Sequence, residues 1–219
     1  MSAAVCLAVF EPAKAEEKKV DLRAPTKVEA QSAAKGPTGA TKKWIDAENK
    51  LIDPLGEKDK ESVLILRNKY SYIQATRVVS RDVGNAVEAC GKKNPDMKDK
   101  MSARYNQWRS AIDPILDTAE KQLDKDIDAQ KVVDADDLRD VLDLHDEAYE
   151  ASEKQVTKTP VTTREACEGT LASMDRTEDN LITILQQTLL PEGAIRKRAA
   201  DAEKIQPQKR NMSADKKAD

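Results

Sequence analysis

Apolar residues between positions 41 and 192 recur every three or four residues, which is the spacing that places side chains on one face of an α-helix. The most regular stripe begins after Asp96 and contains Met97, Met101, Tyr105, Trp108, Ile112, Ile115, Ala119, Leu123 and Ile127. Pro114 interrupts this stripe without changing its phase. We therefore expect one helix kinked at the proline, rather than a new helix that starts with Pro114 at its first position.

A second long helix is predicted earlier in the chain, from about residue 60 to Cys90. Its seam steps by three, four or seven residues and contains Ile65, Tyr72, Val79, Val83, Ala86 and Cys90. Gly91 is placed to end this helix as a left-handed cap, and Pro95 prevents its continuation. A short helix over residues 41–53 is expected to precede it.

Two more long helices are predicted after residue 133. Asp134 can cap the first, whose apolar side carries Leu138, Val141, Leu142, His145, Ala148 and Tyr149. Thr162 and Glu165 form a capping box at the start of the second, which carries Cys167, Leu171, Met174, Leu181, Leu185 and Leu189. Because short loops place successive helices antiparallel, the sequence predicts an all-α, up-down bundle of four long helices plus a short N-terminal helix, over residues 41–192.

Composition supports this fold and argues against several classes of function. Charged residues make up 35% of the 219 residues and aromatic residues 3%, a balance that favours helices with solvated faces over sheets. The net charge of −3 gives no overall field that would attract nucleic acid, and the basic segments carry no aromatic residues for base stacking. No apolar stretch approaches the roughly 18 residues of a membrane span. We therefore expect neither nucleic-acid binding nor a transmembrane span.

The two ends of the chain differ from the predicted bundle. Residues 3–10 are apolar and Ala13-Lys14-Ala15 has the small-x-small form of a signal-peptidase site, so residues 1–15 are predicted to be a short signal peptide and the protein to be periplasmic or secreted. Because the apolar run is short and no basic residue precedes it, a frayed terminus of a cytoplasmic protein is the alternative. Residues 16–40 are predicted to be a disordered linker, and residues 193–219 a basic disordered tail.

Cys90 and Cys167 are predicted to form a disulfide. Cys90 lies in the last turn of one predicted helix and Cys167 in the first turn of another, and the alternating directions of an up-down bundle bring both to the same end. After removal of residues 1–15 no other cysteine remains, which suits an oxidising compartment. The alternative is that two buried thiols pack as small hydrophobic groups.

We recognise no catalytic constellation and no cofactor motif, so the protein is predicted not to be an enzyme and to need no cofactor. His145 is the only histidine, whereas di-iron bundles need paired Glu-x-x-His motifs. Serine and threonine nucleophiles lack a base, and no Gly-rich phosphate loop occurs. The alternative is a ligand or metal site inside the bundle, built from His145, Met97, Met101 or the acidic region 124–140.

The acidic region has part of a calcium-loop pattern. Asp124, Asp126 and Asp128 have the spacing of the first ligand positions, but Ala129 replaces the glycine of the turn and Ala135 the bidentate glutamate. Further acidic residues nearby are Asp134, Asp136, Asp137 and Asp140. Weak cation binding and ordinary solvated helix ends are therefore the two interpretations of this region.

The predicted helix that begins after Asp134 is strongly acidic. From residue 134 to residue 154 nine acidic and two basic residues give a net charge of −7. Such a face aids solubility, and it can also dock a basic partner or the chain's own basic segment 195–198. Together with the export-like N-terminus and the predicted disulfide, it favours a non-catalytic protein that works through protein–protein contacts in the cell envelope.

Overall fold

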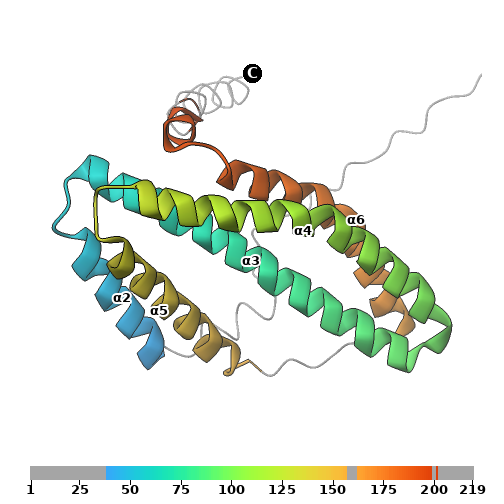
Figure 1. Cartoon of the computed structure of the whole chain (residues 1–219). Helices are drawn as coiled ribbons and strands as arrows, with labels where there is room; N and C mark the ends of the chain where they lie inside the picture. The colour runs from blue at the N-terminus through green and yellow to red at the C-terminus, as the bar shows by residue number, and fades with distance from the viewer. Residues whose placement is uncertain (1–37, 157–161, 199–200, 202–219) are drawn as a thin grey trace, which may run out of the picture. The chain divides into compact units, whose positions relative to one another are not determined.

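The computed structural model describes residues 38–156, 162–198 and 201, and it is all-α over these residues (Figure 1). The fold class predicted from the sequence is therefore confirmed. The elements are α2 (Gly39–Ile52), α3 (Glu57–Lys93), the 3₁₀-helix η1 (Pro95–Met97), α4 (Lys98–Ala129), α5 (Ala135–Glu153) and α6 (Arg164–Thr188). The predicted signal peptide and nearly all of the predicted linker lie outside the described residues.

The two longest helices, α3 and α4, run in opposite directions. Near the start of α4, the Tyr105 hydroxyl donates a hydrogen bond to the carbonyl oxygen of Ser80 at 3.0 Å. Near its end, Asp126 pairs with Lys69, which lies earlier on α3, at 2.6 Å. α6 packs against both of these helices, whereas α5 packs mainly against α2. This pairing differs from an up-down bundle in which each long helix packs on the next, because α5 packs mainly on α2 rather than on α4 or α6.

The core contains most of the stripe predicted for α4, but the buried side of α3 differs from the predicted seam. Tyr72 of that seam is 49% exposed, and Val87 is buried although the seam did not include it. Tyr149 of the predicted apolar side of α5 is also exposed.

No surface is exposed on Met101, Trp108 and Ile112 of α4 or on Leu185 of α6, and Ile73 of α3 is almost as completely enclosed. Burial of each such side chain contributes about 1.5–3 kcal/mol to folding before entropic costs. The same cluster includes Leu66, Val87, Leu116, Leu123, Ile127, Leu138, Leu142, Leu171 and Met174.

Gly91 has a different role from the predicted one. α3 continues through it to Lys93, and no described residue has a positive φ, so Gly91 is not a left-handed cap. A Cβ added at Gly91 would lie 3.2 Å from Cγ of Lys98, so the glycine lets the start of α4 pass close to α3. The C-cap of α3 is Asn94.

The helix boundaries can be compared with those predicted from the sequence. α4 is one continuous helix with Pro114 inside it, so the proline does not begin a new helix. Asp134 caps α5 as predicted, because its side chain accepts hydrogen bonds from the Asp136 and Asp137 amides. α6 is capped by Thr163 rather than by Thr162, since it is the Thr163 hydroxyl that accepts from Ala166 N. α5 has 19 residues, or about 28 Å at 1.5 Å per residue.

Residues 192–198 are helical, although the sequence predicted a disordered tail from residue 193. Arg196 explains the order, because it donates hydrogen bonds to the Lys58 carbonyl oxygen (2.8 Å) and to the Ser62 hydroxyl (2.9 Å) and pairs with Glu61. Ser62 in turn donates to Glu192 at 2.9 Å. The basic segment that was considered as a ligand for the acidic helix therefore contacts the start of α3 instead.

Candidate functional site

The predicted disulfide between Cys90 and Cys167 is present. It joins the last turns of α3 to the first turn of α6, with the two Cα atoms 5.8 Å apart. Both cysteines have no exposed surface. Closing a loop of 77 residues removes conformational entropy from the unfolded chain, which is worth about 4–5 kcal/mol.

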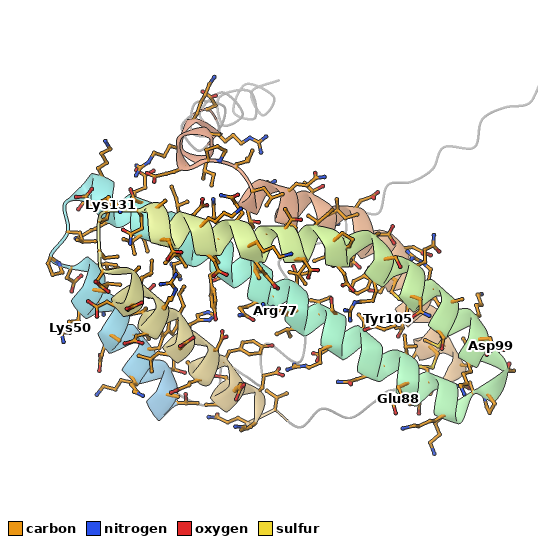
Figure 2. All side chains as sticks on the ribbon, in the orientation of Figure 1. Lys50, Arg77, Glu88, Asp99, Tyr105 and Lys131 are labelled. Atoms are coloured by element: carbon orange, nitrogen blue, oxygen red, sulfur yellow. A yellow bond between two sulfur atoms is a disulfide. The ribbon has the colours of Figure 1, made fainter. Side chains whose placement is uncertain are left out.

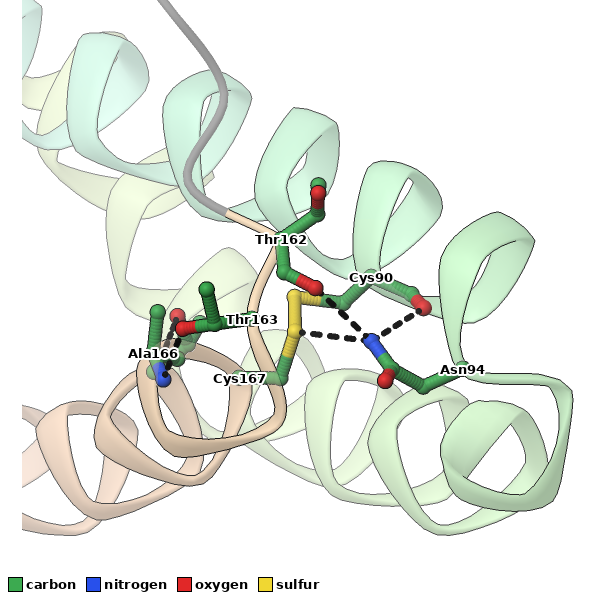
Figure 3. Close-up of a disulfide and its surroundings, with 7 residues drawn as sticks. Cys90, Asn94, Thr162, Thr163, Ala166 and Cys167 are labelled. Carbon is green, nitrogen blue, oxygen red and sulfur yellow. Dashed lines mark hydrogen bonds between the residues drawn. A yellow bond between two sulfur atoms is a disulfide. The ribbon is translucent and has the colours of Figure 1, made fainter.

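Asn94 ties the loop before α6 to this disulfide (Figure 3). Its side-chain amide donates hydrogen bonds to the Thr162 carbonyl oxygen at 3.0 Å and to the Cys90 carbonyl oxygen at 3.3 Å. The same amide lies 3.5 Å from Sγ of Cys167. The Asn94 side chain thus links α3, α6 and the loop residue Thr162 that precedes α6. We call the Cys90–Cys167 disulfide together with Asn94 the clamp.

His145 lies between two aromatic rings on neighbouring helices. Its ring meets Trp44 of α2 edge-on, with the centroids 4.9 Å apart, and Tyr70 of α3 with the centroids 5.8 Å apart. The Nδ1 atom lies 3.4 Å from a carboxylate oxygen of Asp146, and the histidine side chain is 19% exposed. These contacts are those of a packing residue that connects α2, α5 and α3.

Tyr70 and Asp146 form the polar part of this connection. The Tyr70 hydroxyl donates to Asp146 Oδ2 at 2.6 Å, and the Gln74 amide donates to the same oxygen at 3.2 Å. Burial and the neighbouring Asp146 carboxylate raise the pKa of Tyr70 well above its ordinary value. The tyrosine is therefore a fixed hydrogen-bond donor at neutral pH.

The methionines proposed as further ligands lie far from this histidine. Met97 and Met101 are buried beside the end of α3 that holds Cys90. Tyr70, which touches His145, precedes Cys90 by 20 residues on α3 (90 − 70), or about 30 Å along a helix. The structure does not bring His145 and the two methionines together.

The calcium-loop pattern lies on a helix rather than on a loop. Asp124, Asp126 and Asp128 all belong to α4, where residues two apart point to nearly opposite sides. Asp126 is engaged by Lys69, and Asp128 pairs with Arg139. Within the described residues, no group of three or more possible metal-ligating side chains is found.

Lys69 is a buried charge that the sequence analysis missed. It is 4% exposed, and its ammonium group donates to Asp126 Oδ2 at 2.6 Å and to the Leu190 carbonyl oxygen at 2.9 Å. It therefore binds the end of α4 and the chain after α6 to α3. A sequence signal existed, because Lys69 lies midway between Leu66 and Ile73, at the three-to-four-residue spacing of the core face.

A hollow of about 360 Å³ separates α3 from α5, and we call it the α3–α5 groove. Its α3 wall contains Ser71, Gln74, Ala75, Arg77, Val78 and Arg81, and its α5 wall contains His145, Asp146, Tyr149 and Glu150. Figure 2 shows Arg77 on the side of α3 that faces α5. Tyr149 is 37% exposed, so the groove offers aromatic surface to solvent.

The outer side of α5 carries what we call the acidic stripe. It consists of the exposed residues Asp136, Asp140, Asp143, Glu147 and Glu150. They follow one another at steps of four, three, four and three, which places them in one row on the helix. The row lies opposite the buried residues Leu138, Val141, Leu142 and Ala148.

The described helices were examined for membrane spans, and the chain was compared with known proteins. No described helix is both long and apolar enough to cross a membrane. Comparison with protein families, with curated proteins and with solved structures gives no match.

Proposed function

We propose that the protein is exported and acts without catalysis, through protein–protein contacts in the cell envelope. The observation that carries this proposal is the acidic stripe of α5, which borders the α3–α5 groove. Glu150 belongs to both features, so an anionic surface and a hollow with an exposed aromatic ring are continuous.

The acidic stripe lowers the stability of α5, and a face that served only solubility would not need like charges in one row. Neighbouring like charges three or four residues apart destabilise a helix by about 0.2–0.5 kcal/mol per pair, and the stripe contains four such pairs in sequence. Among the described residues, the stripe's ion pairs to basic side chains are those of Asp136 with Arg139, Glu147 with Lys43 and Glu150 with Lys154. A basic partner protein would remove this repulsion on binding.

The side chains in the body of the bundle that could take part in catalysis are instead bonded to other side chains and hold the helices together. Lys69 is bound to Asp126, Tyr70 to Asp146, and the cysteines to each other. The disulfide also supports the proposed compartment, since disulfides form and persist mainly outside the cytosol. These features support a binding role more than a catalytic one.

The contact is tested by capture of cross-linked partners in the envelope fraction of the native cell. Tagged wild-type protein is compared with Asp140→Asn/Asp143→Asn and with the control Asp117→Asn/Asp179→Asn. All four residues are exposed carboxylates, so the change in charge is the same in both variants. We expect one reproducible partner with wild type and control, and its loss with the stripe variant. No reproducible partner with wild type, or equal capture by all three, would contradict the proposal.

Export is tested separately by the intact mass of protein recovered from its native cell under non-reducing conditions. A mature chain that begins at Glu16 and is two hydrogens lighter than the reduced chain would agree with cleavage and with the disulfide. A full-length chain with free thiols would contradict the proposed compartment.

A further inference from the structure

The two walls of the α3–α5 groove carry opposite charge. Arg77 and Arg81 stand on the α3 wall, and Asp146 and Glu150 on the α5 wall. The arginine side chains are 48% and 49% exposed, and that of Glu150 is 71% exposed. Arg77 also binds Glu120, and Arg81 binds Asp82 and Glu153, the last residue of α5. A guanidinium has five N–H donors, so each arginine can donate to a further carboxylate.

The α3 wall also carries a row of small side chains. Ser71, Ala75 and Val78 follow one another at steps of four and three, so they share one face of α3. None of the three is buried. Small residues at such spacing allow the backbone of another helix to approach closely and to insert its own ridges.

The size and the walls of the groove favour a helix over an extended peptide. From Ser71 to Arg81 the groove follows α3 for ten residues (81 − 71), which is about 15 Å or nearly three helical turns. An extended peptide would need free backbone donors and acceptors at a sheet edge. Both walls are α-helices, whose backbone groups are already paired internally, so recognition must use side chains.

We propose that the α3–α5 groove binds an amphipathic helix of about three turns from a partner protein. This helix carries small or apolar residues toward Ser71, Ala75 and Val78, acidic residues along the flank that faces Arg77 and Arg81, and basic residues along the flank that faces Glu150. The inference rests on the proposed function, because it assigns a site and a partner chemistry to the protein–protein contact.

The test uses the full oxidised chain and two labelled synthetic helical peptides of the same composition. In the first peptide glutamates occupy one flank and lysines the other, and in the second both residue types are mixed on each flank. Fluorescence anisotropy at low salt is expected to show binding of the first peptide and at least about tenfold weaker binding of the second. Added salt should weaken the binding, because the paired charges are exposed.

Charge reversal on one wall provides the decisive variants. Glu150→Lys takes the α5 wall from a charge of −2 to zero, because Asp146 remains, and Arg81→Glu takes the α3 wall from +2 to zero, because Arg77 remains. Each should therefore weaken the binding of the first peptide about tenfold. The double variant leaves neither wall with a net charge, so it should bind the two peptides equally weakly. Asp117→Lys on α4 lies outside the groove and is the matched control.

Each outcome decides the inference. Equal affinity of wild type for the two peptides would overturn it, and so would a double variant that still prefers the first peptide while its circular dichroism is unchanged. The same holds if wild type binds neither peptide because a segment of its own chain or a second copy fills the groove. Binding in this assay together with no partner in the envelope capture would contradict the proposed function and leave the groove assignment standing.

Discussion

The end of the bundle that holds the disulfide and the pair formed by α2 and α5 are stabilised in different ways. Cys90, Cys167, Met101 and Trp108 are fully enclosed where α3, α4 and α6 meet. By contrast α2 has no fully buried residue, and α5 has only the four already named. One region is held by extensive apolar burial and a covalent bond, and the other by fewer buried apolar residues together with partly exposed rings and ion pairs.

This difference indicates how stability and recognition are divided in the chain. Segments that bind partners are commonly drawn from the less stable parts of a protein. The acidic stripe and the α3–α5 groove both involve α5, whereas the disulfide end carries the rigid core. The clamp can therefore hold the fold while α5 tolerates repulsive charges.

Removal of the disulfide should have the largest effect on this comparison. Cys90→Ala/Cys167→Ala is expected to lower the free energy of unfolding by about 4–5 kcal/mol, because the unfolded chain regains the entropy of a 77-residue loop. Urea unfolding of the variant and of the oxidised wild type measures the loss. A difference below about 1 kcal/mol would show that the clamp does not dominate stability.

Breaking the buried ion pair should have the next largest effect. Lys69→Met leaves the Asp126 carboxylate, which is 27% exposed, without its cation. We expect a loss of about 2–3 kcal/mol, below the range for a wholly buried pair because water reaches Asp126. The double variant Lys69→Met/Asp126→Leu should recover most of this loss in the same unfolding experiment. A double variant as unstable as the single one would contradict the account.

Truncation of Trp44 should affect only the weaker region. Trp44→Ala removes the ring that packs on His145, and because Trp44 is only partly buried, the expected cost is about 1–2 kcal/mol. Hydrogen exchange should accelerate in α2 and α5 and stay unchanged around Cys90. Equal acceleration at both ends would show that the two regions unfold together.

Alkaline pH should weaken the same connection through Tyr70. The pKa of Tyr70 is raised in the folded protein by burial and by Asp146, so the unfolded chain ionises first as the pH rises through the ordinary value of 10.0. The contribution of Tyr70 is complete below that pH and is lost above it. Tyr70→Phe should therefore lose less stability than wild type between pH 9 and pH 11, a window of roughly one unit on each side of the ordinary pKa. Parallel losses in the two proteins would contradict this assignment.

Neutralising the acidic stripe should have the smallest effect on stability. Asp140→Asn/Asp143→Asn relieves repulsion along α5, so thermal unfolding should show a gain of a few tenths of a kcal/mol. The same variant is the one expected to lose the partner. A clear loss of stability would mean that these carboxylates hold the fold together rather than serve recognition.

The sequence predicted the helices and the disulfide because both depend on regular spacing. The three-to-four-residue stripe through Trp108 and Ile112 marked α4, and helix alternation brought Cys90 and Cys167 to one end. Helix ends were less well predicted. Thr163 caps the start of α6 where the sequence predicted Thr162, and Asn94 caps the end of α3 where the sequence predicted Gly91.

Features that depend on contacts between distant segments were not predictable from periodicity. Nothing in the spacing of α5 indicated that it would pack on α2, or that a groove would remain beside α3. The order of residues 192–198 was missed for the same reason, because it depends on Arg196 reaching the start of α3. Lys69 was visible as a charge within an apolar seam, but its partner lies 57 residues away.

The most direct test of the division between the two regions is amide hydrogen exchange, followed segment by segment in the full oxidised chain. The account predicts that the amides of α4 and of the last turns of α3, near Cys90, exchange only through global unfolding, and that α2 and α5 open at lower free energy. Equal protection in all of these helices would show a single cooperative unit. That result would contradict the view that a clamped core supports a separate, less stable recognition element.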